Sequence, residues 1–255
     1  TFDGNVTMAG TLATTGNATF SGDIIKSTSG TSNFAAGVNA GNSIASGGNY
    51  NTVVGDEAGT ALTTGDGNTA VGFEALKTED AHGFNTALGY QTLKMQNAGA
   101  EGYNVAVGHQ AGTAITTGIA NVIVGALAGD AMTTGLINVL VGTNAGSGLT
   151  EGQENVAMGH NTLLVDTKGK RSTALGYGTL AAQNFTSLTE VYNTAVGFNS
   201  GANITTGIQN TLIGGLAGIN LTDADYNVAV GVAALDADTK GNKSTAIGYN
   251  ALSTQ

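Results

Sequence analysis

One five-residue phrase occurs twelve times in this chain at nearly constant spacing, and it constrains the fold more than any other feature. The phrase reads Asn or Ser, Thr or Val, an uncharged residue, an aliphatic residue and Gly, and we number each coil from its first residue. The copies start at Asn51, Asn68, Asn85, Asn104, Asn121, Asn138, Asn155, Ser172, Asn193, Asn210, Asn227 and Ser244. The step between starts is constant, except that it is slightly longer after Asn85 and after Ser172. A fixed period of about 20 residues or a little less is typical of a solenoid, in which each unit packs on its neighbours.

The phrase itself predicts a β-strand. Positions 1 to 5 are uncharged in every coil, position 4 is always aliphatic, and position 3 is Ala in eight coils. A short alternating segment rich in Thr and Val indicates a strand rather than a helix. Positions 2 and 4 then lie on one face and position 3 on the other. Both faces lack charge, which favours a strand covered on two sides. We expect a flattened coil two short strands wide.

Two positions of the phrase carry backbone requirements. Position 5 is Gly in all twelve coils, which predicts a positive φ or a close backbone approach that a Cβ atom would obstruct. Position 1 is Asn in ten coils. Stacked strands would bring these amides into a side-chain ladder along the axis; a separate turn-capping role for each Asn is the alternative.

The second half of the coil predicts one large aliphatic side chain per coil. Position 8 is always Ala, Thr or Ser, and position 9 is Gly in six coils and Leu in six. When position 9 is Gly, position 12 is aliphatic; when position 9 is Leu, position 12 is polar. A close-packed interior accepts one such group in a slot, not two. The predicted structural core is Gly55, Leu62, Gly72, Leu76, Leu93, Gly108, Ile115, Gly125, Met132, Leu149, Leu163, Leu180, Ile204, Leu221, Leu235 and Leu252.

So narrow a coil has little interior, which predicts self-association. A 17-residue circuit spans at most about 56 Å, and ordering each residue costs about 1 kcal/mol or more. The uncharged outer strand face could pack on other copies, so we expect a parallel homotrimer, with a dimer or a wider monomeric solenoid as alternatives. The fold class is therefore all-β, a parallel β-solenoid or β-roll. The predicted divisions are 1–30, a β-rich segment; 31–50, a junction or first irregular coil; and 51–255, the repeat domain.

Composition excludes several classes of function. The chain of 255 residues has no Cys and no Pro, and eight basic against 18 acidic residues give a net charge of −10. Nucleic-acid binding requires a basic surface, so no nucleic-acid partner is expected. There is no thiolate metal site. The long apolar run that predicts membrane insertion is also missing from the sequence.

No arrangement of residues predicts catalysis, and we expect no enzyme activity, cofactor or metal. His82, His109 and His160 lie in different coils, with the last two about 14 Å apart if coils stack at about 4.8 Å, and are expected on the surface. The acidic pairs Glu79/Asp80, Asp223/Asp225 and Asp236/Asp238 fall where turns are expected. A glycan-hydrolysing carboxylate pair or a calcium site at these residues is a minor alternative.

Aromatic residues flank the strand on both sides. We call the residue at position 1 the anchor of its coil. Position 6 and the residue immediately before each anchor hold ten of the 14 aromatics. Exposed rings would offer platforms for sugars, whereas buried rings would seal an interface between chains. The candidate receptor or glycan contacts are Phe73, Tyr90, His109, His160, Tyr177, Phe198 and Tyr249.

The repeat, as in Asn68-Thr-Ala-Val-Gly-Phe-Glu-Ala-Leu76, resembles repeats of bacteriophage tail-fibre proteins and the β-roll heads of trimeric autotransporter adhesins. Segments such as Gly4-Asn-Val-Thr-Met8 look like tail-fibre shafts. The resemblance implies a homotrimeric structural fibre on a virion, extracellular, contacting a host cell-surface glycan or protein. The alternative it implies is a bacterial surface adhesin. Ice binding by a Thr array is only a minor alternative, because position 2 alternates between Thr and Val and so forms no regular Thr face.

Overall fold

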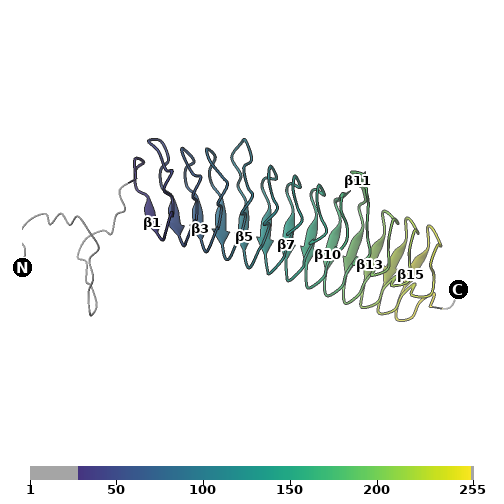
Figure 1. Cartoon of the computed structure of the whole chain (residues 1–255). Helices are drawn as coiled ribbons and strands as arrows, with labels where there is room; N and C mark the ends of the chain where they lie inside the picture. The colour runs from purple at the N-terminus through teal and green to yellow at the C-terminus, as the bar shows by residue number, and fades with distance from the viewer. Residues whose placement is uncertain (1–27, 254–255) are drawn as a thin grey trace, which may run out of the picture.

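The computed structural model describes residues 28–253 as one long stack of coils, each stepping along a common axis (Figure 1). Thirteen of the coils contribute one short strand each to a single sheet. These strands are β1 (Phe34–Ala36), β2 (Thr52–Val54), β3 (Thr69–Val71), β4 (Thr86–Leu88), β5 (Val105–Val107), β6 (Val122–Val124), β7 (Val139–Val141), β8 (Val156–Met158), β10 (Thr173–Leu175), β12 (Thr194–Val196), β13 (Thr211–Ile213), β14 (Val228–Val230) and β15 (Thr245–Ile247). The predicted parallel β-solenoid is confirmed.

The sheet is parallel throughout and every coil is in register with the next. Position 2 of each coil pairs with position 2 of its neighbour, as Thr69 does with Thr86, and positions 3 and 4 follow. The register holds across both long coils: Thr86 pairs with Val105, and Thr173 pairs with Thr194. The extra residues therefore leave the stack unbroken.

The opposite wall of the coil differs from the expected second strand. Among the described residues it consists of turns, with only a short pair, β9 (Gly169–Lys170) and β11 (Thr189–Glu190), beside it. The turns are still joined between coils: the N–H of Thr116 donates to the carbonyl of Thr133 at 2.9 Å. Closely spaced left-handed residues at positions 7 and 9 bend this wall too sharply for a regular strand.

Position 5 forms a corner of the coil. Gly125 has φ +139°, and a Cβ atom there would lie 2.4 Å from the carbonyl oxygen of Gly142 in the next coil. The glycines predicted as core, Gly55, Gly72, Gly108 and Gly125, are half-buried at this corner rather than inside the core. They pack against backbone, since successive corners touch.

The position 1 side chains form the predicted ladder. Asn121 is fully buried; its Oδ1 accepts the backbone N–H of Asn138 at 3.0 Å and the amide of Asn138 at 3.1 Å. Its own Nδ2 donates to the carbonyl of Gly135 at 3.0 Å, across the same coil. Each Asn of the ladder therefore joins its neighbour and also closes its own coil, except that Asn85 Nδ2 donates to the carbonyl of Gly83 in the preceding coil.

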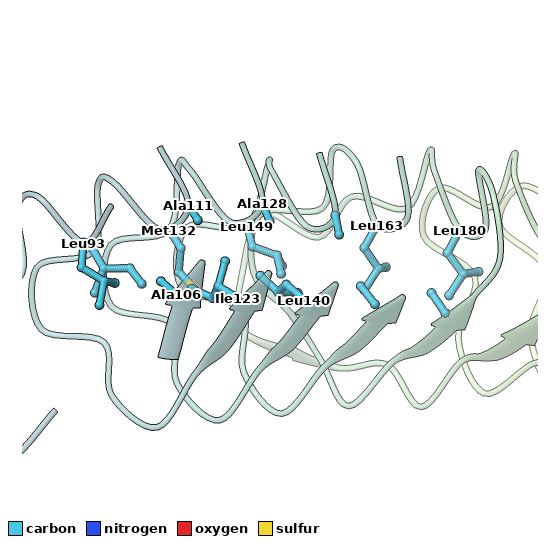
Figure 2. Packing of buried hydrophobic residues seen from close by; sticks show 14 of the residues in the cluster. Leu93, Ala106, Ala111, Ile123, Ala128, Met132, Leu140, Leu149, Leu163 and Leu180 are labelled. Atoms are coloured by element: carbon cyan, nitrogen blue, oxygen red, sulfur yellow. The ribbon is translucent and has the colours of Figure 1, made fainter. Parts of the chain in front are cut away.

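The interior is one continuous column of small and aliphatic side chains between the sheet and the turn wall (Figure 2). It contains position 3, the Ala residues at position 8, and one large aliphatic from position 9 or 12 of each coil. In three coils position 3 adds a second large aliphatic, Ile123, Leu140 or Leu212. Of the predicted aliphatic residues, eleven are completely buried: Leu62, Leu76, Leu93, Ile115, Met132, Leu149, Leu163, Leu180, Ile204, Leu221 and Leu235. The exception is Leu252, which is 38% exposed because it lies in the last described coil, covered on one side only.

Position 9 has the same backbone conformation whether it is Gly or Leu. Gly59 has φ +52° and Leu76 has φ +49°. A Leu residue in the left-handed region costs roughly 1–2 kcal/mol, while burying its side chain contributes about 1.5–3 kcal/mol. Burial therefore offsets the backbone strain in the Leu-type coils.

A further coil precedes the twelve. Residues 31–50 hold strand β1, and Phe34 pairs with Thr52. Asn33 makes the bonds of an anchor, with Nδ2 donating to the carbonyl of Gly48 at 2.8 Å and Oδ1 accepting the N–H of Asn51 at 2.8 Å. The segment is thus a first coil rather than a junction. The expected β-rich segment at 1–30 falls almost entirely outside the described residues.

Candidate recognition surface

The candidate contact residues at position 6 lie in one exposed column along the rod. Phe73, Tyr90 and His109 stack in sequence, with ring centroids 5.3 and 5.2 Å apart and planes within 19°. His160, Tyr177 and Phe198 form a second stack, with spacings of 5.3 and 5.5 Å. Between the stacks position 6 holds Ala126 and Thr143. The structure thus brings six of the seven candidates into two stacks; Tyr249 stands apart, 78% exposed.

These stacks constrain how the rings can bind a ligand. Parallel rings at one-coil spacing cover each other's faces, so the middle of a stack presents edges to solvent. Tyr177 is nevertheless 51% exposed and Phe198 is 55% exposed. The rings are not buried within the chain, so the column is available for contact.

An open groove of about 500 Å³ lies beside the second stack. Tyr177 forms part of its wall, together with the amide side chains of Asn161, Asn199 and Asn203. Leu164, Ile219 and several Ala residues provide an apolar floor. An aromatic ring, an apolar floor and a few convergent amides are typical of a binding site for a small or chain-like ligand.

The sequence did not predict this groove. Asn161 and Asn199 occupy position 7, where the left-handed backbone tolerates Asn, so each looks like an ordinary turn residue. The groove arises because small residues at positions 10 and 11 of successive coils, such as Ala181 and Ala202, lie beside these amides. Only a pattern read between coils could reveal it.

Four polar residues at position 12 of Leu-type coils, Glu79, Gln96, Asp166 and Gln183, are completely buried, whereas Asp238 is half-buried. Asp166 is completely buried; its Oδ2 accepts the amide of Gln183 at 2.6 Å, and its Oδ1 accepts the N–H groups of Phe185 and Gly169. Burial raises the pKa of Asp166, and these hydrogen bonds offset part of the rise. Asp166 and Gln183 form a satisfied polar pair across two coils.

Glu79, at the equivalent position, is also completely buried. Burial raises the pKa of Glu79, and contacts with His82 lower it by less. Among the described residues, Glu79, Asp80 and His82 can each place one ligand atom within 4.8 Å of the others. Half-buried His82 therefore differs from the expected surface residue, whereas His109 and His160 are exposed.

Two other acidic residues, Asp225 and Asp238, stabilise turns. Asp225 Oδ1 accepts the N–H of Ile208 at 2.8 Å, one coil away. Asp238 Oδ1 accepts the N–H of Gly241 at 2.7 Å and that of Lys240 at 3.1 Å. These bonds satisfy backbone donors in the turns and give both carboxylates a structural role.

No protein-family model matches this chain, and neither a curated protein nor a solved structure is significantly similar to it. Over residues 28–253 there is no helix of the length and apolarity needed to cross a membrane.

Proposed function

We propose that this chain is a segment of a homotrimeric fibre, of the phage tail-fibre kind, that projects from a virion and contacts the surface of a host cell. The role is structural and adhesive, with no catalytic step. One observation carries the fibre assignment: an uncharged strand face runs along the whole in-register stack and stays open on the outside.

That face is suited to joining copies of the chain. Positions 2 and 4 hold only Thr, Val and other aliphatic residues in the twelve coils. Twelve coils at about 4.8 Å give a strip about 58 Å long. Its exposed members include Leu88, Val105, Val122, Met158 and Ile213, each 37–45% exposed. Contiguous exposed apolar surface of this kind marks interaction sites.

Aromatic and aliphatic residues extend the strip at its margin. In six coils the residue before the anchor is an exposed aromatic or aliphatic residue: Tyr50, Phe84, Tyr103, Ile137, Tyr192 and Tyr226. Because all coils step in one direction, copies aligned in parallel would present the same face at every level. In a closed assembly with rotational symmetry, every copy would bury its strand face to the same extent. We favour an assembly of three copies.

The groove beside Tyr177 supports the adhesive part of the proposal. Amides of Asn161, Asn199 and Asn203 can donate to and accept from sugar hydroxyls, while the Tyr177 ring packs on the apolar face of a sugar. A host cell-surface glycan fits this chemistry. Three grooves per fibre would turn weak single contacts into firm attachment.

Binding of the intact chain to bacterial surface polysaccharides tests the adhesive role. We expect Tyr177→Ala and Asn199→Gly to weaken binding at least tenfold. Asn250→Gly is the matched control, since Asn250 has the same position and backbone, φ 52° against 50° for Asn199, but does not line the groove. Binding that survives both groove substitutions would place the contact outside the groove, and absence of binding by the wild-type chain would leave the rod as a spacer only.

A trimeric bacterial surface adhesin is the alternative function, because it uses the same rod for the same contact. Localisation distinguishes the two: antibody labelling of virions supports the fibre, and labelling of the bacterial envelope supports the adhesin.

A further inference from the structure

The coil from Asn68 to Phe84 departs from the repeat at three places that lie close together. The other two Leu-type coils of ordinary length read Asp166-Thr-Lys-Gly169 and Asp238-Thr-Lys-Gly241 from position 12. Here the same positions read Glu79-Asp80-Ala81-His82. Position 13 is otherwise Thr or Asn, and position 15 closes the coil through its carbonyl, usually as Gly. Three ligand-type side chains thus replace Asp, Thr and Gly at one turn.

The turn itself keeps its shape. Glu79 Oε1 accepts the N–H of His82 at 3.3 Å, as Asp166 Oδ1 accepts the N–H of Gly169 at 3.1 Å and Asp238 Oδ1 that of Gly241 at 2.7 Å. The carbonyl of His82 still accepts Nδ2 of Asn68 at 3.1 Å. The backbone conformation of the turn therefore does not require Asp80 or His82, and these side chains are available for another role.

Two atoms of this group lack hydrogen-bond partners. Glu79 is completely buried and its Oε2 has no partner, and the buried Nδ1 of His82 has none, although it lies 3.5 Å from Glu79 Oε1. In the equivalent pair the amide of Gln183 satisfies Asp166, whereas the amide nitrogen of Gln96, the counterpart of Gln183, has no partner. A buried carboxylate oxygen without a partner is costly, and a bound cation removes that cost.

We propose that Glu79, Asp80 and His82 bind one divalent metal ion of the zinc class. Two carboxylate oxygens and an imidazole nitrogen can lie within 4.8 Å of one another, close enough to surround one ion. Zn²⁺ accepts such mixed oxygen and nitrogen ligands, with water completing four-fold coordination. Ca²⁺ requires six to eight oxygen ligands, and a nitrogen donor is unsuited to it.

The ion has a structural role in the stack. The carbonyl of Asp80 accepts the N–H of Thr63 at 2.6 Å and its hydroxyl at 3.0 Å, so this turn is bonded to the preceding coil. Fixing Asp80 against Glu79 and His82 therefore fixes the junction between two coils. Metal binding stabilises the folded chain because the unfolded chain lacks the assembled site.

Calorimetry and metal analysis of the untagged full chain with ZnCl₂ test the site. We expect one Zn²⁺ per chain, a rise in the melting temperature with Zn²⁺, and no such rise with CaCl₂. The double variant Asp80→Thr with His82→Gly restores residues that other coils hold, so it should fold normally and lose at least tenfold in Zn²⁺ affinity. Glu79→Gln, which keeps the side-chain shape, should lose a similar factor.

His160→Ala is the control for binding at exposed imidazoles, and it should keep the wild-type affinity and stoichiometry. Absence of Zn²⁺ uptake by the wild-type chain would overturn the proposal. Equal uptake by wild type and the folded double variant would overturn it as well.

Discussion

Leu93 and Ile115 converge on one point of the interior although they occupy different positions of their coils. A Cβ atom added to Gly112 would lie 3.1 Å from Leu93 Cδ2 and 2.9 Å from Ile115 Cδ1. Leu180 and Ile204 meet in the same way at Gly201, at 2.9 and 3.1 Å. The alternation between Leu at position 9 and an aliphatic residue at position 12 therefore fills one continuous column from two backbone positions.

Converting one Leu-type coil to the Gly type should preserve most of the free energy of unfolding. Leu93→Gly removes the large side chain and should cost about 2–5 kcal/mol of unfolding free energy. Adding Gln96→Leu converts the coil to the Gly type and should recover most of that loss. Urea unfolding of the two variants measures the difference; a double variant no more stable than Leu93→Gly would contradict the shared column.

The corner glycines should tolerate no side chain. Gly125→Ala places a Cβ atom 2.4 Å from the Gly142 carbonyl oxygen at φ +139°, and should cost about 3 kcal/mol or more. Gly99→Ala is the control, since Gly99 has φ +67° and open space around it, and should cost about 1–2 kcal/mol. Thermal unfolding compares them, and equal melting temperatures would contradict the close approach.

The buried Asn ladder should contribute more to the free energy of unfolding than exposed Asn side chains do. Asn121→Ala leaves the buried backbone N–H of Asn138 and the carbonyl of Gly135 without the partners that Asn121 supplies, each worth about 1–3 kcal/mol. Asn144→Gly removes one bond to Asn161 on a half-exposed surface and should cost at most about 1 kcal/mol. Hydrogen exchange of the Asn138 amide reports the ladder directly, and its unchanged protection in Asn121→Ala would argue against this role.

Acid should remove the contribution of Glu74. Lys77 and Lys94, each 2.6 Å away, with the Gln91 amide at 2.7 Å, lower its pKa from 4.5 to about 2. A lowered folded pKa stabilises the chain above the unfolded value, and this stabilisation is lost as pH falls from about 4.5 through about 2. The stability difference between wild type and Glu74→Gln should shrink across that window. A difference that is constant between pH 6 and pH 2 would contradict the ion-pair account.

Regular periodicity made most of the fold predictable. The strand at positions 2–4, the Gly corner, the Asn ladder and the large aliphatic at position 9 or 12 all follow from local residue types repeated in register. The first coil was harder to recognise, because Phe34 and Ala36 replace the usual residues of the phrase. The left-handed backbone of Leu76 could not be predicted from its residue type, because burial of the side chain rather than local preference stabilises that conformation.

The candidate site features depend on contacts between coils that the repeat does not encode. Gln96 and Gln183 at position 12 contact the Asn ladder, since the amides of Asn104 and Asn193 donate to them at 2.8 and 2.9 Å. Glu79 and Asp166 are buried at the same position of their coils. The groove beside Tyr177 combines residues from successive coils. Neither is visible in one coil taken alone.

The mass of the intact chain in solution tests the fibre assignment most directly. One chain has a mass of 25.1 kDa, and the account predicts a particle of three chains by sedimentation or light scattering. Introducing charge into the strand face with Val122→Glu and Ile213→Glu should dissociate it to single chains, while Ser147→Glu on the turn wall should not. A stable monomer for the wild-type chain would contradict the proposal that its open strand face joins copies into a fibre.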